Sequence, residues 1–295
     1  MIPPAATVVV PSCERDGWLA SLLGELLAHE ARAAFEVIVV DQSAGGSQRA
    51  RAVVAGDERV RFLSQATPNL SLARNAGIAA SRAPIVVFAD DDVRLSPGWL
   101  DAHVAAYEDA SVHAVAGRVT DVRWPGTRRG PTGDFSWFGY DPGNYDATER
   151  RRVRTGLGSN MSFRRASLEA VGGFDERLGG GVCLREDSDC FLRVHARFGG
   201  VLFEPAAHVV HLAAPTGGVR TAALAERPEL YRNEALFFLK HFRAGAFPVF
   251  LALTFLRHAV LPQARSGALS PATVLRATRA MAAGTALGVR LARRN

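Results

Sequence analysis

The chain has 295 residues, of which 48% are hydrophobic and 22% charged, and this composition excludes an intrinsically disordered protein. The net charge of +6 comes from 35 Lys and Arg against 29 Asp and Glu, an excess that suits anionic partners such as phosphates and acidic lipids. Three cysteines without CxxC spacing argue against a zinc site or a disulfide framework. Together with the absence of a signal-peptide pattern, they favour a cytoplasmic protein.

The first hundred residues predict strands that alternate with helices. Continuous apolar, β-branched runs lie at 7–10, 35–40, 60–63 and 85–88, and helical patterns lie at 18–29, 48–55 and 72–81. Apolar strands separated by helices are typical of a parallel sheet that is covered on both faces. We therefore predict a Rossmann-like α/β fold for this part of the chain.

The second part of the chain has a different rhythm. After a helix from residue 99 and a strand near 114–119, a long irregular stretch at 123–150 is rich in Gly, Pro and aromatic residues. Loops of this length are usually functional or disordered, and the aromatic content favours an ordered, functional loop over a disordered one. A packed satellite cluster of aromatic residues stays open as the alternative. Regular patterns return at 157–163, and a helix is predicted at 186–198.

Three consecutive carboxylates, Asp90, Asp91 and Asp92, follow the apolar strand at 85–88 directly. They must lie at its carboxyl end, where open α/β sheets bind ligands, because a buried strand cannot carry three adjacent charges inside the sheet. Carboxylates this close repel one another unless a cation joins them, and their oxygens suit a hard divalent ion. Asp41 closes another strand, and no glycine fingerprint follows the first strand, so a metal-bridged nucleotide diphosphate is predicted rather than a dinucleotide.

Seven short motifs follow one another along the chain: Val8-Val9-Val10-Pro11-Ser12, Val39-Val40-Asp41-Gln42-Ser43, Leu70-Ser71-Leu72-Ala73-Arg74-Asn75-Ala76-Gly77, Asp90-Asp91-Asp92, Gly158-Ser159-Asn160-Met161, Gly173-Phe174-Asp175-Glu176 and Arg185-Glu186-Asp187-Ser188-Asp189. In this order they resemble an inverting family-two glycosyltransferase, and the resemblance covers residues 5 to 215. It implies a GT-A fold, with a mostly parallel central sheet flanked by helices. We expect a GT-A domain at 1–220, with a nucleotide-binding half at 1–120 and an acceptor-binding half at 121–220, and a helical region at 221–295.

The resemblance also implies a donor site and a metal site. Asp41 would accept a hydrogen bond from the nucleotide base, Asp90 would hold the ribose or the metal, and Arg74 would contact a phosphate. Asp92 would bind the Mn²⁺ or Mg²⁺ that bridges the diphosphate, with Asp90 and with His211, for which a purely structural role stays open. The predicted nucleotide-sugar contacts are Pro11, Ser12, Glu14, Asp41, Arg74, Asn75, Asp90 and Asp91.

Asp187 is the predicted general base, because an inverting transfer needs one carboxylate to take the proton of the acceptor hydroxyl. Glu186 and Asp189 are alternatives, and the helix dipole alone explains an acidic residue at either position. The predicted acceptor contacts are Trp137, Tyr140, Asn160 and Glu186.

The sequence departs from the family pattern in two places that bear on the predicted reaction. Gln42 stands where an acidic residue is common, and the Gln-x-x-Arg-Trp signature of processive synthases is absent, which favours transfer of a single sugar. The expected donor is a UDP-, GDP- or dTDP-sugar, and the expected acceptor is a hydroxyl of a glycan, lipid or small molecule. The alternative is a catalytically silent protein of the same fold that binds a nucleotide sugar or forms a membrane scaffold.

The carboxyl-terminal residues combine apolar and basic character. The uncharged segment between Arg243 and Arg257 is shorter than the ~20 residues that a transmembrane helix needs, and the predicted last helix at 272–294 carries several arginines. We predict peripheral contact with the inner face of the cell membrane, with packing as a lid on the catalytic domain as the alternative. No nucleic-acid-binding pattern is visible, so no nucleic acid is expected as a partner, and the oligomeric state stays open.

Overall fold

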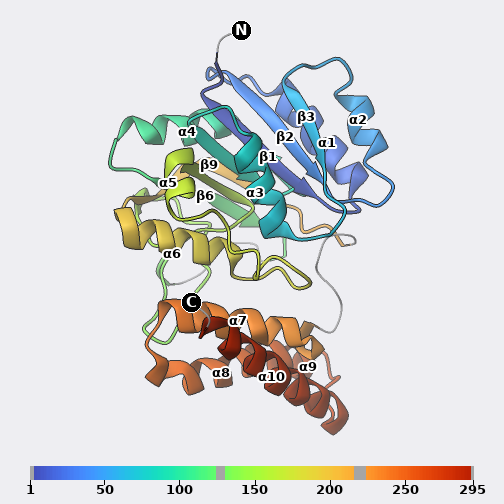
Figure 1. Cartoon of the computed structure of the whole chain (residues 1–295), viewed down its shortest axis with the longest axis vertical. Coiled ribbons are helices and arrows are strands. Elements are labelled where there is room, and N and C mark those ends of the chain that lie inside the picture. Colours follow the sequence, from blue (N-terminus) through green and yellow to red (C-terminus); the bar gives the residue numbers. More distant parts are fainter. Residues whose placement is uncertain (1–2, 124–129, 216–223, 294–295) are drawn as a thin grey trace.

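The computed structural model describes residues 3–123, 130–215 and 224–293. Its centre is a nine-stranded sheet flanked by helices, and a group of helices drawn in orange and red lies at one end of this sheet (Figure 1). The predicted α/β class and the helical carboxyl-terminal region are confirmed. The predicted domain boundary at 220 lies outside the described residues, as do residues 124–129 of the predicted long loop and Arg294 of the predicted last helix.

The strands are β1 (Ala6–Ser12), β2 (Phe35–Asp41), β3 (Val60–Ser64), β4 (Ile85–Ala89), β5 (Val93–Leu95), β6 (Ala114–Asp121), β7 (Arg151–Arg152), β8 (Asn160–Arg164) and β9 (Val201–His211). The α-helices are α1 (Asp16–Ala28), α2 (Gln48–Val53), α3 (Leu70–Ala80), α4 (Trp99–Ala105), α5 (Arg165–Ala170), α6 (Glu186–Phe198), α7 (Pro228–His241), α8 (Phe247–Phe255), α9 (Leu261–Arg265) and α10 (Pro271–Ala292). Short 3₁₀ turns are η1 (Ala106–Glu108), η2 (Leu224–Glu226) and η3 (Ala244–Ala246), and η4 (Leu256–Val260) is a π-helical turn.

The strand order is β3-β2-β1-β4-β8-β6-β9-β5, with β7 on β9. The sheet is mostly parallel, since the longest ladders, β1 with β2 and β6 with β9, are parallel, while β8 enters antiparallel between β4 and β6. The chain runs outward from β1 to β3 and then returns to β4 on the other side of β1. The strand order therefore reverses between β1 and β4, which is where open sheets of this kind bind ligands.

Strands β1, β2 and β4 are buried along their whole length, which explains their continuous apolar sequence. Alternate residues of β1 enter different cores: Val8 and Val10 pack with Leu22 and Trp99 on one face, and Val9 packs on the other. The second core contains a group of rings, Phe88, Phe163, Phe174 and Phe191. With apolar side chains on both faces, the sheet is a rigid support for the polar residues at its edge.

The carboxyl-terminal helices pack closely on one another, and α10 lies along α7 (Figure 1). Small residues allow this approach, because a Cβ atom on Gly284 would lie 2.0 Å from the carbonyl oxygen of Pro228 and one on Gly288 would lie 2.6 Å from that of Arg232. Helix α7 also reaches the rest of the protein, since Phe237 packs against Phe135 of the irregular segment and Leu192 of α6. The helical region is thus attached to the α/β part of the protein through an apolar contact.

The uncharged segment after Arg243 belongs to a longer helix than the charge pattern predicted. In the described part of the chain, one continuous helix spans Ala244–Arg265, 22 residues that are long and apolar enough for a membrane span by length and composition. The charge pattern underestimated the length of this helix, because the helix does not end at Arg257 but continues through Arg257 and His258 in η4. Only 22% of the apolar 18-residue stretch of this helix is buried inside the protein.

The close contact of α10 with α7 makes a testable prediction. Gly284→Ala should destabilise the folded protein by about 1–3 kcal/mol through overpacking, although Ala is favoured over Gly in an isolated helix by about 1 kcal/mol. Urea unfolding measures the change. Ala283→Leu, a larger change at an exposed position of the same helix, should shift stability by less than about 0.5 kcal/mol. A stabilised Gly284→Ala variant would show that the two helices do not pack as described.

Candidate active site

The three carboxylates after β4 lie beside the end of β1, at the point where the strand order reverses. Ser12 donates a hydrogen bond to Asp91 Oδ2 over 2.6 Å, and Arg15 Nη1 lies 3.0 Å from Asp91 Oδ1 and 3.3 Å from Asp92 Oδ2. The backbone N–H of Ala214 donates to Asp92 Oδ2 over 2.8 Å. These donors from β1, the loop after it and the chain after β9 hold the acidic residues in place.

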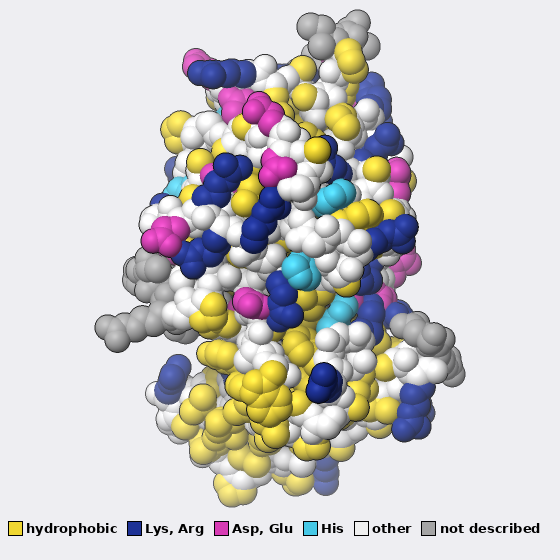
Figure 2. Space-filling view, turned by 90° about the vertical axis from the view of Figure 1, so that its left-hand side faces the viewer, with side chains coloured by type: hydrophobic (Ala, Val, Ile, Leu, Met, Phe, Trp, Pro, Cys, Tyr) yellow, Lys and Arg dark blue, Asp and Glu magenta, His cyan; other side chains and the backbone are white. Residues whose placement is uncertain are grey.

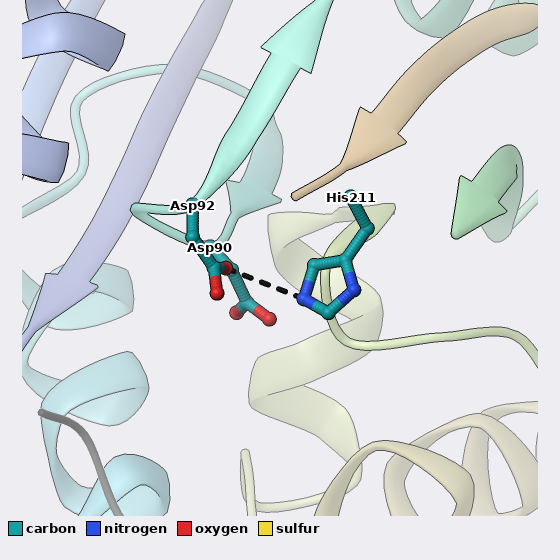
Figure 3. Close-up of side chains that lie close together, drawn as sticks. All are labelled: Asp90, Asp92 and His211. Atoms are coloured by element: carbon teal, nitrogen blue, oxygen red, sulfur yellow. Dashed lines mark ion pairs between the residues drawn. The ribbon is translucent and has the colours of Figure 1, made fainter. Parts of the chain in front are cut away.

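Asp90, Asp92 and His211 form a group that could hold a metal ion. Each offers a ligand atom within 4.8 Å of the others, and all three side chains point toward one another from the loop after β4 and the end of β9 (Figure 3). Asp92 Oδ1 is buried and faces His211 Nε2 at 3.3 Å, yet it accepts no hydrogen bond. A buried carboxylate oxygen without a donor fits a cation, and two carboxylates with one imidazole are a donor set that Mn²⁺ accepts.

Asp121 orients the imidazole of His211. Its Oδ2 lies 3.0 Å from His211 Nδ1, so that Nε2 is directed at Asp92. Burial alone would lower the pKa of His211, but its contacts with Asp92, Asp90 and Asp121 raise it above the usual value. A metal ion would have to displace a proton from this ring, which couples metal affinity to pH.

Arg74 connects the metal group, which is Asp90, Asp92 and His211, with Glu186 at the start of α6. Its guanidinium is fully buried, 3.0 Å from Glu186 Oε1 and 3.6 Å from Asp90 Oδ1. Gly158 provides the room, because a Cβ atom there would lie 2.5 Å from Arg74 Nη2. Burial, with the charge of Asp187 adding to it, raises the pKa of Glu186 to about 7. The ion pair with Arg74 opposes this shift.

Asp187 lies at the start of α6 and faces the same cavity as the metal group. Its Oδ2 accepts a hydrogen bond from the backbone N–H of Gly158 over 2.8 Å, and its Oδ1 accepts one from that of Ser188 over 2.6 Å. These two bonds fix the carboxylate while each oxygen keeps a lone pair for a further donor. The position of the Asp187 carboxylate is therefore fixed, and both of its oxygens can still accept a hydrogen bond.

A cavity of about 430 Å³ joins these groups, within the range of small-molecule sites. The predicted site residues that line it are Pro11, Ser12, Arg74, Asp90, Asp91, Asp92, Glu186, Asp187 and His211. Of the predicted residues, six are not in its lining in the described structure: Glu14, Asp41, Asn75, Trp137, Tyr140 and Asn160.

Asp41 and Gln42 follow β2, next to the end of β1. Asp41 is buried and accepts hydrogen bonds from the backbone N–H groups of Ser43 and Ser47, which outweigh the effect of burial and lower its pKa. Gln42 lines the cavity itself, with its Oε1 accepting from the backbone N–H of Asn69 and from Gln65. Gln42 thus lines the cavity, whereas the carboxylate of Asp41 organises the loop after β2.

Glu14 and Asn75 have backbone partners. Glu14 accepts a hydrogen bond from the backbone N–H of Ala44, and Asn75 bonds both the N–H and the carbonyl of Phe174. Trp137 and Tyr140 are 72% and 47% exposed, on the surface of the irregular segment.

Asn160 was predicted as an acceptor contact, and the structure places it inside the core. Its Oδ1 accepts from Trp99 Nε1 and lies 2.9 Å from His103 Nε2, while its Nδ2 donates to the carbonyl oxygens of Arg118 and Ala207. These contacts occupy both polar atoms of the side chain, so Asn160 ties β8 to its neighbours and is unable to reach an acceptor. We do not retain it as a site residue.

Sequence analysis missed several residues of the cavity. Arg15, Asp121, Arg123, Arg185 and Arg257 all line it. Asp121 had a usable signal, because it closes β6 as Asp41 closes β2. Arg185 also had a signal, because it opens the motif that contains Asp187. The other arginines had none, since a single Arg in a loop or an apolar helix is ordinary in sequence.

Comparison with known proteins agrees with this geometry. The model of the family described as "Glycosyl transferase family 2" matches residues 7–172, more than half of the chain. The chain belongs to this family. This family-2 protein is 31% identical over 208 residues to the succinoglycan biosynthesis protein ExoM of Rhizobium meliloti, a match that covers 66% of this chain and 62% of ExoM. It spans less than two thirds of the length of the curated relatives that it matches.

Solved structures share the fold. The mannosyltransferase PcManGT of Pyrobaculum calidifontis, in complex with GDP-Man and Mn²⁺, has a TM-score of 0.58 at 18% identity, over 99% of this chain and 79% of that one. S. aureus TarS, in complex with UDP-GlcNAc, has a TM-score of 0.64 at 17% identity, over 93% and 79%. The predicted GT-A fold of the family-2 domain is confirmed.

The buried Asp91 predicts a pH effect in the metal-free protein. Burial raises its pKa from 3.8 to about 6, although Arg15 and Ser12 oppose the shift, so the folded state favours the protonated acid. This contribution to stability is present below pH 3.8 and is lost as the pH rises through 6. Asp91→Asn lacks the proton equilibrium, and its stability relative to the native chain should increase by about 2–3 kcal/mol across this window. Urea unfolding at several pH values measures it, and parallel curves for the two proteins would contradict it.

Proposed function

We propose that this protein is a metal-dependent, inverting glycosyltransferase that moves a single sugar from a nucleoside diphosphate sugar to an acceptor hydroxyl. One observation carries the proposal: the metal-binding group of Asp90, Asp92 and His211 and the carboxylate of Asp187 face one cavity at the switch point of the sheet. Membership of family 2 supports the reaction class, and two neighbours of the same fold are described with bound nucleotide sugars.

The donor diphosphate would lie at the carboxylates after β4. Asp90, Asp92 and His211 would hold Mn²⁺ or Mg²⁺, which as a Lewis acid stabilises the charge on the departing diphosphate. Pro11, Ser12 and Gln42 would line the nucleoside side of the cavity, and Arg74, which also lines it, would contact a phosphate. A UDP-, GDP- or dTDP-sugar is the proposed donor.

Asp187 is the proposed general base. An acceptor hydroxyl that attacks the anomeric carbon must lose its proton to a carboxylate on the side opposite to the leaving group. Two observations support Asp187: it lines the same cavity as the metal group, on α6, and hydrogen bonds fix its position. Glu186 is the less suitable residue, since Arg74 engages it and burial favours its protonated form.

The acceptor would enter from the side of the irregular segment, where Asp141 and Tyr145 line the cavity. Trp137 and Tyr140 stay proposed outer contacts for a large acceptor, because exposed aromatic faces stack on sugars and lipids. We place the reaction in the cytoplasm, where the thiols of Cys13, Cys183 and Cys190 would stay reduced, as they are in the structure.

Metal dependence is the first test. Binding of UDP and of GDP, measured by calorimetry, should tighten when Mn²⁺ is added, and Asp92→Asn should remove most of this gain, because it removes an anionic metal ligand. Asp146→Asn, which also changes a carboxylate of the cavity lining but not of the metal group, should keep the gain. Equal nucleotide affinity with and without Mn²⁺ would sink the proposed role of these residues.

Asp187 is tested by turnover. With a panel of nucleotide sugars, release of nucleoside diphosphate should fall by about 10²–10⁴-fold in Asp187→Asn, the usual contribution of a general base. Nucleotide binding with Mn²⁺ should be unchanged, which separates loss of the base from misfolding. No turnover with any donor by the native chain would favour the catalytically silent alternative, and release of pyrophosphate would indicate nucleotidyl transfer instead.

A further inference from the structure

The charges of this protein are distributed very unevenly along the chain. The 61 residues after Glu234 contain nine Lys or Arg and no Asp or Glu. The preceding 234 residues therefore hold 26 basic and 29 acidic side chains, a net charge of −3. The whole positive excess of the protein thus lies in α7 to α10 and the segments that connect them.

The same region exposes its apolar residues in a regular pattern. Along the helix Ala244–Arg265, Val249, Leu253 and Leu256 recur at intervals of four and three residues, and Leu261 extends the row. Side chains at this spacing share one face of a helix. They are 38% to 45% exposed, so the apolar stripe of this helix points away from the protein. A helix whose apolar stripe faces water lacks a partner for that face.

Helix α10 carries basic residues on its exposed side. Its buried positions are small: Ala280, Gly284 and Gly288 face α7, and Ala277 packs against Ala225 and Ala259. The positions that stay exposed include Leu275 and Leu287 together with Arg279 and Arg290. In the space-filling view, the lower end of the molecule shows hydrophobic and basic side chains, while the acidic ones lie above it (Figure 2).

We propose that the helical region of residues 244–293 docks this protein on the surface of an anionic lipid bilayer. The apolar stripe of Val249, Leu253 and Leu256 would enter the interface, and the arginines would lie among the acidic head groups. This proposal stands independently of the transfer reaction.

Two other occupants fit the observations less well. A second copy of the chain would bring two surfaces of net positive charge together, and Glu226, which pairs with Arg276 of α10, compensates only one of these charges in each copy. A membrane span would bury Arg257 and His258, together with the π-helical turn η4 that carries them, in hydrocarbon. A bilayer surface instead accepts both the apolar stripe and the positive charges.

The docking surface is continuous with the cavity. Arg257 belongs to the helix that carries the stripe, and it also lines the cavity that holds the metal group. π-helical turns are frequent at functional sites, and this one carries the Arg257 side chain that lines the cavity. A docked protein would therefore present its cavity next to the lipid surface, within reach of an acceptor anchored there.

Vesicle sedimentation of the full chain tests the proposal. The protein should sediment with vesicles of phosphatidylcholine and phosphatidylglycerol, much less with phosphatidylcholine alone, and less at high salt. Replacing three exposed arginines, Arg265→Gln, Arg279→Gln and Arg290→Gln together, should lower the partition coefficient by about 100-fold, since each contributes about fivefold near an anionic surface. Leu253→Gln with Leu256→Gln should lower it by about tenfold or more.

A matched control changes the same charge elsewhere. Arg150→Gln, Arg151→Gln and Arg152→Gln, at exposed positions of the catalytic half, should leave sedimentation within about twofold. Circular dichroism and unchanged nucleotide binding show that each variant is folded. Equal binding to neutral and anionic vesicles, an equal loss in the control, or a dimer in solution without any lipid binding would each overturn the proposal.

Discussion

Arg15 and His211 hold the carboxylates of Asp91 and Asp92 side by side at the edge of the sheet, and the candidate site depends on this compensation of charge. Without these contacts, adjacent carboxylates at a buried strand end would repel one another or take up protons. The compensation is incomplete, since Asp91 still has a raised pKa and one oxygen of Asp92 accepts no hydrogen bond. A bound divalent cation would supply the positive charge that is still needed to compensate these carboxylates.

Arg74 also compensates the charge of carboxylates, and it does so between two distant parts of the chain. Its buried guanidinium joins Asp90, after β4, to Glu186, at the start of α6, and so fixes the donor side of the cavity relative to the proposed base. A buried ion pair of this kind contributes little net stability, but removal of one partner leaves a buried charge and costs about 3–5 kcal/mol. Its value lies in geometry, because it positions Asp187 next to the metal group.

The charges of the two halves suit different partners. The catalytic part has a slightly negative net charge and concentrates carboxylates in its cavity, so a phosphorylated donor needs a cation there. The 61 residues after Glu234 contain no acidic residue, and the helix Ala244–Arg265 among them exposes an apolar stripe. With an acidic cavity in one part and a basic, apolar surface in the other, one chain would bind a soluble donor and a charged surface at once, as we propose.

Much of the fold was predictable from local sequence. The runs of Val and Ile at β1, β2 and β4 read correctly as buried parallel strands, and the strand-end positions of Asp41 and Asp90 to Asp92 followed from the cost of burying charge. The helix at 186–198 was also placed correctly, because its apolar residues repeat at helical spacing. Each of these predictions depends on a residue and its near neighbours in the chain.

What the sequence by itself determined is therefore the sheet, its acidic edge and the family. Only the tertiary structure decided that Asn160 is a core residue, that Gln42 rather than Asp41 lines the cavity, and that Arg15, Asp121 and Arg257 belong to it. The physical reason is that these roles are set by partners far away in the chain. Asn160 meets Trp99 and Ala207, and Asp121 meets His211, through strand pairings whose register no local pattern encodes.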